Sequence, residues 1–254
     1  MIKHTHTEPT EVNFSKLKER IMQVNDPCLG KYNDIREMLY DLTIDNKPTL
    51  IMATGGSKVI AYYLQLIIER LGLTGIICEV IEPRDYFYKA NRDMFSNLIA
   101  ISASGNTNGI SEALLDFRGN KYLITENKKE SNYQVVSWSN ELYDREKSFI
   151  SLATSLGPIS LLLDSTTSLN LELGSNEIKR INDKIKELLS RSKEKINKLN
   201  VDFKDTSLIQ IMSGYETKTS ASVLESNLTE VGLAPAVIHD KGSYCHGRSN
   251  LLFQ

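Results

Sequence analysis

Hydroxyl side chains and glycines gather in two short segments of the sequence that could bind an anion. Residues 54–57 read Thr-Gly-Gly-Ser, and residues 102–107 read Ser-Ala-Ser-Gly-Asn-Thr. Hydroxyl groups donate hydrogen bonds, and glycine has no side chain to keep a ligand away from the backbone. Both properties suit a phosphate group. The candidate phosphate-binding residues are Ser57, Ser102, Ser104, Thr107, Gly56 and Gly105.

Each of these segments follows a short apolar run and precedes a helical pattern. The runs at residues 49–53 and 97–102 predict strands, and the helical patterns extend to about Leu71 and over residues 110–117. The amino end of a helix carries unpaired N–H groups and a partial positive charge, which favour a phosphate. Serine and threonine also cap helices when no ligand is bound. Two such segments at successive positions of one sheet favour binding over capping alone.

Further strand-like runs continue the alternation of strand, turn and helix. They span residues 75–80, 121–125 and 134–138. Strands that alternate with helices are typical of a parallel sheet with helices on both faces. We therefore expect the α/β class, with three αβα layers around a parallel sheet. Ligands of such sheets bind beyond the carboxyl ends of the strands, where both hydroxyl segments fall.

The same patterns divide the chain into four parts. We expect a helical N-terminal segment at residues 1–45, a first α/β domain at 46–170, a connecting helix at 171–205 and a partial second α/β domain at 206–254. The order strand, glycine turn and helix returns at residues 207–231, which is a weak internal repeat of the first domain.

Composition and charge exclude several classes of protein. The 254 residues are 41% apolar and 24% charged, as in an ordinary globular protein. The net charge of −2 does not indicate the basic surface that nucleic-acid binding requires. Three distant cysteines do not make a disulfide framework, and no cysteines or histidines have the spacing of metal ligands. No apolar run is long enough to cross a bilayer. We expect a cytoplasmic protein with no metal, no cofactor, no membrane contact and no nucleic-acid partner.

The two hydroxyl segments resemble the motifs of the sugar isomerase (SIS) domain family. That family has a Gly-small-Ser turn after its first strand and a Ser-x-Ser-Gly-x-Thr/Ser loop after a later strand, which here are residues 55–57 and 102–107. The Ser-Gly-Asn-Thr-Asn form of the loop looks like the phosphoheptose isomerase branch. The resemblance covers roughly residues 45–254. It implies a flavodoxin-like, doubly wound sheet in which the four hydroxyl residues named above hold the phosphate of a phosphorylated sugar.

The C-terminal stretch at residues 230–248 carries a second resemblance. It is similar to the second SIS domain of glucosamine-fructose-6-phosphate aminotransferase and of the bifunctional phosphoglucose/phosphomannose isomerases, in which a helix carries a glutamate and a His-Gly motif follows. The match implies that Glu230 is the base for the C1/C2 proton and that His246, 16 positions later (246 − 230), opens the sugar ring. We expect His239, which has no counterpart, at the surface. Because the family often takes a histidine from a neighbouring subunit, we expect a homodimer or a larger homo-oligomer.

Several functions remain open at this stage. The pair Glu230 and His246 favours an enzyme, an aldose–ketose sugar-phosphate isomerase. The alternatives are a non-catalytic sugar-phosphate sensor or regulatory subunit, and an enzyme like the amino-sugar-phosphate aminotransferases or deaminases. No glutaminase domain with an N-terminal cysteine precedes the SIS motifs, which disfavours a glutamine-fed reaction. The chain ends eight positions after His246 (254 − 246), so we expect an incomplete second SIS domain, as in a fragment or a shortened relative.

Overall fold

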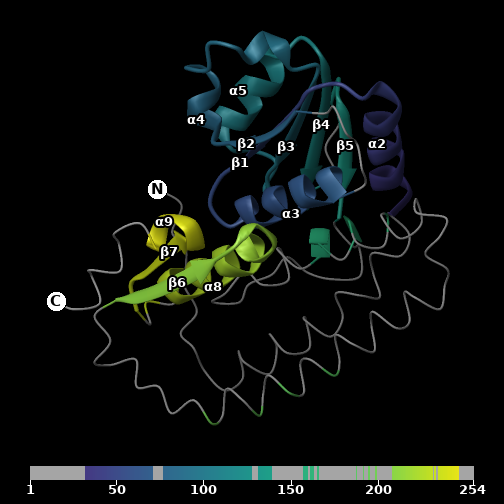
Figure 1. The fold of residues 1–254 in the computed structure, drawn as a ribbon. Helices are drawn as coiled ribbons and strands as arrows, with labels where there is room; N and C mark the ends of the chain where they lie inside the picture. Colours follow the sequence, from purple (N-terminus) through teal and green to yellow (C-terminus); the bar gives the residue numbers. More distant parts are fainter. Residues whose placement is uncertain are drawn as a thin grey trace.

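Two α/β units make up the described part of the chain. The computed structural model describes residues 32–70, 77–127, 131–138, 208–230 and 234–245, with Gly232 and scattered helical positions between 157 and 198. Figure 1 shows the larger unit with the smaller one beside it. Within these described ranges, no helix combines the length and the apolar character that crossing a membrane requires. The predicted domain boundaries stay predictions.

The larger unit is a parallel sheet in the order β2-β1-β3-β4-β5. All four neighbouring pairs are parallel, and the chain moves outward from β1 to β2 on one side and from β3 to β5 on the other. This is the flavodoxin-like, doubly wound order, and it confirms the expected fold class. Its elements are α2 (Tyr32–Asp45), β1 (Thr49–Ala53), α3 (Ser57–Arg70), β2 (Cys78–Ile81), α4 (Pro83–Tyr86), the 3-10 turn η1 (Arg92–Met94), β3 (Asn97–Ile101), α5 (Asn108–Asp116), β4 (Asn120–Thr125) and β5 (Gln134–Ser137).

Helices cover both faces of this sheet because its central strands are apolar on both faces. Ile51 and Ala53 of β1 pack with α2 and α3, whereas Leu50 and Met52 pack with α5. Successive residues of a strand point to opposite faces, so a strand that is apolar throughout must be covered on both. In Figure 1, α2 and α3 lie on one side of the sheet and α4 and α5 on the other. The three-layer αβα arrangement is therefore confirmed.

The observed elements differ from the expected ones mainly at their ends. Strand β2 begins at Cys78 and ends at Ile81, later than the predicted run at residues 75–80. Helix α5 begins at Asn108, two residues before the predicted start, because Thr107 takes the N-cap position. Asn108 and Gly109 are not apolar, so periodicity gives no signal for this first turn.

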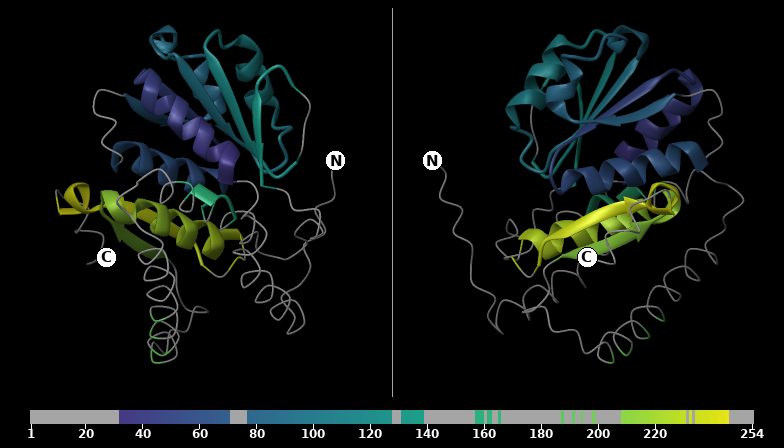
Figure 2. Two further views of the ribbon diagram at one scale, coloured as in Figure 1. Left: turned by 90° about the vertical axis from the view of Figure 1, so that its right-hand side faces the viewer. Right: turned by 60° about the vertical axis from the view of Figure 1, so that its left-hand side comes forward.

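The smaller unit repeats the strand–helix–strand order of the larger one. Its elements are β6 (Ile209–Ser213), the 3-10 turn η3 (Tyr215–Thr217), α8 (Lys218–Glu230), β7 (Ala236–Asp240) and α9 (Lys241–Cys245). Strands β6 and β7 pair in parallel, and α8 packs on both of them and on α3. Both views of Figure 2 show α3 between the first sheet and this unit. The predicted strand and helix at residues 207–231 therefore exist, although the strand begins and ends later.

Strand β7 was not expected, and one residue on it was misplaced. We expected His239 at the surface, but only 4% of its area is exposed, and its ring centre lies 5.3 Å from that of Tyr244. The short run at residues 236–240 follows Pro235 and ends in a histidine and an aspartate, so it lacks the apolar length that marks a strand in sequence. The pairing with β6 makes it a strand and buries the imidazole.

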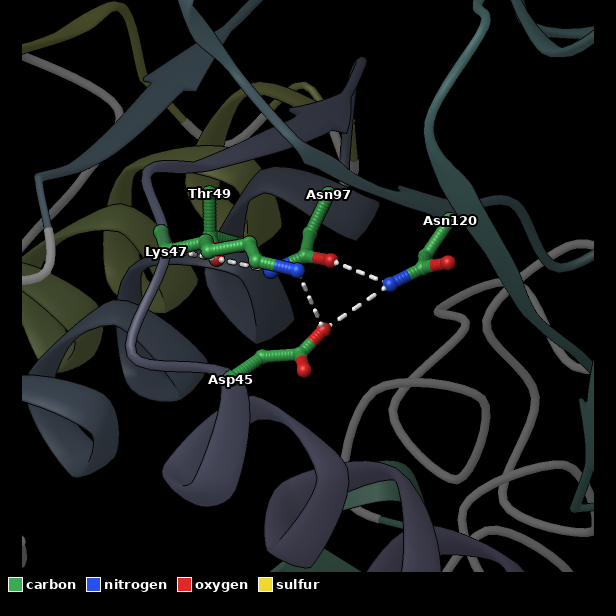
Figure 3. Close-up of polar contacts among 5 residues, drawn as sticks. All are labelled: Asp45, Lys47, Thr49, Asn97 and Asn120. Carbon is green, nitrogen blue, oxygen red and sulfur yellow. Dashed lines mark hydrogen bonds and ion pairs between the residues drawn. The ribbon is translucent and has the colours of Figure 1, made fainter.

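A network of polar side chains joins α2 to the amino ends of the central strands. Asn97 donates to Thr49 Oγ1 at 3.3 Å and accepts from Asn120 Nδ2 at 3.0 Å. Asn120 Nδ2 also donates to Asp45 Oδ2 at 3.1 Å, and Lys47 Nζ lies 3.5 Å from the same oxygen (Figure 3). Asn97 and Thr49 are completely buried, so these bonds replace the water that both residues lose on folding. The network thus fixes the edge of the sheet opposite to the two hydroxyl loops.

We expect Asn97→Ala to lower the free energy of unfolding by about 1–3 kcal/mol, because it leaves buried polar partners without a hydrogen bond. Urea unfolding at neutral pH measures this change. The matched control is Asn132→Ala, whose side chain is exposed and which we expect to stay within about 0.5 kcal/mol of the original protein. Equal values for both variants would show that the network does not stabilise the sheet.

Candidate functional site

The two hydroxyl loops meet at the point where the sheet changes direction. The loop at residues 54–57 follows β1, and the loop at residues 102–107 follows β3. These strands are neighbours, and their last residues, Ala53 and Ile101, are paired. The connection from β1 runs to one side of this pair and the connection from β3 to the other, which leaves the crevice where sheets of this class bind ligands. All six candidate phosphate-binding residues therefore come from adjacent loops at one edge.

Three hydroxyl groups converge within the second loop. Ser102 Oγ lies 3.0 Å from Thr107 Oγ1 and 3.5 Å from Ser104 Oγ. The backbone N–H of Gly105 donates to Ser102 Oγ at 3.1 Å, and that of Asn106 donates to Ser104 Oγ at 3.2 Å. Only 4% of Ser102 is exposed, whereas Ser104 and Thr107 are half-buried and Asn106 is exposed. The Ser102 hydroxyl is therefore held in the interior of the loop, whereas the side chains of Ser104 and Thr107 remain partly accessible to solvent.

Thr107 bears on the alternative that these hydroxyls merely cap a helix. Thr107 is the N-cap residue of α5, but its side chain makes no capping hydrogen bond. Its hydroxyl instead contacts Ser102 across the loop. A capping threonine would direct its oxygen to an N–H of the first helical turn. The amino end of α5 thus keeps its positive polarity beside a cluster of hydroxyls, an arrangement that suits an anion.

Thr125, the last residue of β4, and Asn127, two positions beyond it, hold this loop in place, and neither was predicted from the sequence. Thr125 Oγ1 donates to the carbonyl oxygen of Ala103 at 3.2 Å, and Asn127 Nδ2 donates to that of Ser104 at 2.9 Å. The N–H of Glu126 also donates to Ala103 O, at 3.1 Å. These residues lie at the carboxyl end of β4, the strand next to β3, and that position was the signal that could have predicted their role. Their partners are backbone oxygens, which no sequence motif marks.

The first loop is more open and lies next to an ion pair. Ser57 is the first residue of α3, and Gly55 is exposed. Lys58, the next residue of α3, forms a hydrogen-bonded ion pair with Glu82 at the end of β2. The hydrogen bond from Lys58 lowers the pKa of the Glu82 carboxyl, and the charges of Lys58 and Arg84 lower it further. Because Glu82 already neutralises Lys58, the donors this edge offers to an anion are hydroxyls and backbone N–H groups.

The predicted acid–base pair of Glu230 and His246 stays a prediction. Glu230 is the last residue of α8, and His246 lies outside the described residues. Tyr86, which follows β2, belongs to α4, and its hydroxyl donates to Asp116 Oδ2 at 3.0 Å. In the parts of the chain that the structure covers, no three His, Cys, Asp or Glu side chains gather closely enough to hold a metal ion.

Comparison with known proteins supports the fold through structure alone. No protein-family model and no curated protein sequence match the chain. The C-terminal domain of glucosamine-fructose-6-phosphate aminotransferase from Francisella tularensis superposes with a TM-score of 0.71 and 16% identity, over 96% of this chain and 73% of that one. This domain belongs to one of the proteins that the C-terminal stretch resembles in sequence.

Two further solved structures share this architecture. A protein assigned as sugar-binding, from Salmonella typhimurium LT2, has a TM-score of 0.68 and 12% identity, over 94% of this chain and 77% of its own. A protein assigned as a tagatose-6-phosphate ketose/aldose isomerase, from Clostridium novyi NT, has a TM-score of 0.69 and 17% identity, over 91% and 65%. At these identities the similarity establishes the fold, and it confirms the SIS fold expected from the sequence.

Gly105 provides a test of the loop geometry. Its φ of +66° is unfavourable for any other residue, and an added Cβ would lie 2.9 Å from Thr125 Oγ1. Gly55 has a similar φ of +56°, but an added Cβ would meet nothing within 4 Å. We expect Gly55→Ala to lower the free energy of unfolding by about 1 kcal/mol and Gly105→Ala by about 2–4 kcal/mol, because only the second adds a clash to the strained φ.

Urea unfolding of both variants measures the difference, and Thr125→Ala in the Gly105→Ala background tests its cause. Removing the Thr125 hydroxyl should recover part of the lost stability, although it also removes the bond to Ala103. If Gly105→Ala is no less stable than Gly55→Ala, the close approach of the loop to β4 is wrong.

Proposed function

We propose that this protein binds a phosphorylated sugar at the two hydroxyl loops and interconverts its aldose and ketose forms. The observation that carries the proposal is the hydroxyl cluster at the switch point, in which Thr107 contacts Ser102 instead of capping its own helix. Ser57, Ser104 and the glycines Gly56 and Gly105 complete the phosphate-binding set. A phosphate dianion only accepts hydrogen bonds, and the two loops at residues 54–57 and 102–107 offer hydroxyl and N–H donors and contain no acidic side chain.

The names of the structural neighbours are in line with this proposal. The structures include proteins assigned as phosphosugar isomerases from Bacillus subtilis and Clostridium difficile, besides the sugar-binding protein and the aminotransferase domain. Binding and acting on a sugar phosphate are properties of those proteins, and the resemblance of the loops extends them to this chain as a proposal. We also propose a homodimer or larger homo-oligomer, since the family often completes its site across subunits.

The chemistry requires one base for carbon and one group for the ring. In the proposed reaction, the Glu230 carboxylate removes the proton from C2 of the open-chain aldose, and the electron pair forms the enediol between C1 and C2. Return of the proton to C1 gives the ketose, while the hydroxyl proton passes from O2 to O1. C2 is oxidised as C1 is reduced, so the reaction needs no cofactor. His246, with a pKa near neutrality in its ordinary state, would exchange the proton that ring opening requires.

Removing a single hydroxyl should weaken the binding of the phosphorylated sugar. We expect Ser104→Ala and Thr107→Val each to raise the dissociation constant about tenfold or more, because each loses a hydrogen bond to a charged group. Thermal shift against a panel of pentose, hexose, heptose and amino-sugar phosphates identifies the ligand, and calorimetry gives its dissociation constant. The matched control is Ser111→Ala, which removes a hydroxyl within α5. Binding of the unphosphorylated sugar should change little, and equal loss for both ligands would point to misfolding.

Replacing the proposed base should separate chemistry from binding. We expect Glu230→Gln to lower kcat at least about 100-fold, because proton transfer by a positioned group contributes about 10²–10⁴-fold. Binding of the phosphosugar should remain largely intact. Exchange of a deuterium label from C2 into water measures the proton transfer directly. Glu225→Gln, on the same helix, is the control and should keep full activity. Normal turnover in Glu230→Gln would refute its role, and binding without turnover in the original protein would favour the non-catalytic sensor.

A further inference from the structure

A second cavity lies where the smaller unit meets α3. Its volume is about 430 Å³, which is within the range of small-molecule sites. Ser213 and Asp240 line it from the ends of β6 and β7, where they are paired across the sheet. Tyr62 of α3 contributes a wall from the larger unit. The cavity therefore lies beyond the carboxyl ends of two parallel strands, the position at which such sheets bind ligands.

Lys218 brings an ammonium group to this cavity, whose lining also includes the carboxylate of Asp240. Its Nζ lies 4.0 Å from the centre of the Tyr62 ring. Among the residues that the structure describes, no carboxylate forms an ion pair with Lys218. The face of an aromatic ring attracts an ammonium group, but it does not satisfy all three of its N–H donors. Donors therefore remain for an anionic group of a ligand.

The turn after β6 is closed by two hydrogen bonds between Gly214 and Thr217. The N–H of Gly214 donates to Thr217 Oγ1 at 2.9 Å, and the N–H of Thr217 donates back to Gly214 O at 3.1 Å. The N–H and the carbonyl oxygen of Gly214 are therefore both occupied within the turn. An anion in the cavity would depend on the Lys218 side chain, so that its removal tests the site without disturbing the turn.

The remaining polar groups suit hydroxyls rather than a second anionic group. Ser213 is 5% exposed, and Ser222 lines the cavity from α8. Asp240 Oδ1 accepts from the N–H of Gly242 at 2.9 Å, which fixes its carboxylate at the end of β7. A carboxylate accepts hydrogen bonds from hydroxyl groups and repels a bare anion. The ligand that fits has one anionic end near Lys218 and several hydroxyls near Asp240.

We infer that this cavity is a second binding site, separate from the hydroxyl loops, for a small polyhydroxylated molecule with one anionic group. Sugar phosphates belong to this class, and Tyr62 offers an aromatic wall to the less polar face of such a ligand. The inference does not depend on Glu230, on His246 or on the phosphate loops.

Equilibrium dialysis with labelled glucose 6-phosphate tests the site on the full chain. The variants are Lys218→Met for this cavity, Ser104→Ala/Thr107→Val for the hydroxyl loops, and the two sets combined. We expect the original protein to bind two molecules of glucose 6-phosphate per chain. At moderate ligand concentration, Lys218→Met and Ser104→Ala/Thr107→Val should each bind one molecule, and the combined variant should bind none. Lys218→Met should weaken the second site about tenfold or more, and Lys218→Arg should retain it. Lys198→Met, which removes an exposed charge outside the cavity, is the control.

The outcomes separate this inference from the proposed function. One molecule per chain, lost in Ser104→Ala/Thr107→Val and kept in Lys218→Met, overturns the second site and leaves the phosphate loops intact. One molecule lost only in Lys218→Met supports the second site and overturns the proposed phosphate loops. Glucose and inorganic phosphate, each tested alone, should compete poorly at the Lys218 site. Competition by inorganic phosphate as strong as by glucose 6-phosphate, or no binding of the label at all, overturns the second site.

Discussion

The pairing of β1 with β3 is the constraint on which the rest of the larger unit depends. Every residue of both strands is buried, so neither face can meet water. Two strands of this kind are stable only with helices on each side and further strands at each edge. The chain must therefore leave β1 in one direction and β3 in the other. The two loops that open these connections are left side by side, and no other pair of loops in this sheet has that arrangement.

The two edges of the sheet use polar groups in opposite ways. At the amino edge, the exposed Asn120 bonds to the buried Asn97 and to Asp45, and so joins α2 to the strands. At the carboxyl edge, the hydroxyls of Ser104 and Thr107 remain partly accessible. A fully satisfied network stabilises a fold but has nothing left to offer a ligand, whereas accessible donors are available for binding.

Much of the fold, and the position of the two hydroxyl loops, could be predicted from local sequence. The bounds of β1 were predicted correctly because its apolar run ends abruptly at Thr54-Gly55, and the loop after β3 was marked by its hydroxyls. Strand β7 and the burial of His239 were missed because they depend on pairing with β6, which no local pattern contains. The roles of Thr125 and Asn127 also depend on strand order, since their partners lie 22 and 23 positions away in sequence. The roles of Glu230 and His246 stay predictions.

The contact between Ser102 and Thr107 has a consequence for selectivity. Each hydroxyl has a single proton, so in the unliganded loop one of the two protons is already shared between the oxygens, while Ser102 Oγ also accepts from Gly105. A ligand that only accepts can draw both protons outward, exchanging one internal bond for two new ones. In the proposed site, this contact would therefore favour a group that only accepts hydrogen bonds, such as a phosphate oxygen, over an ammonium group, which only donates.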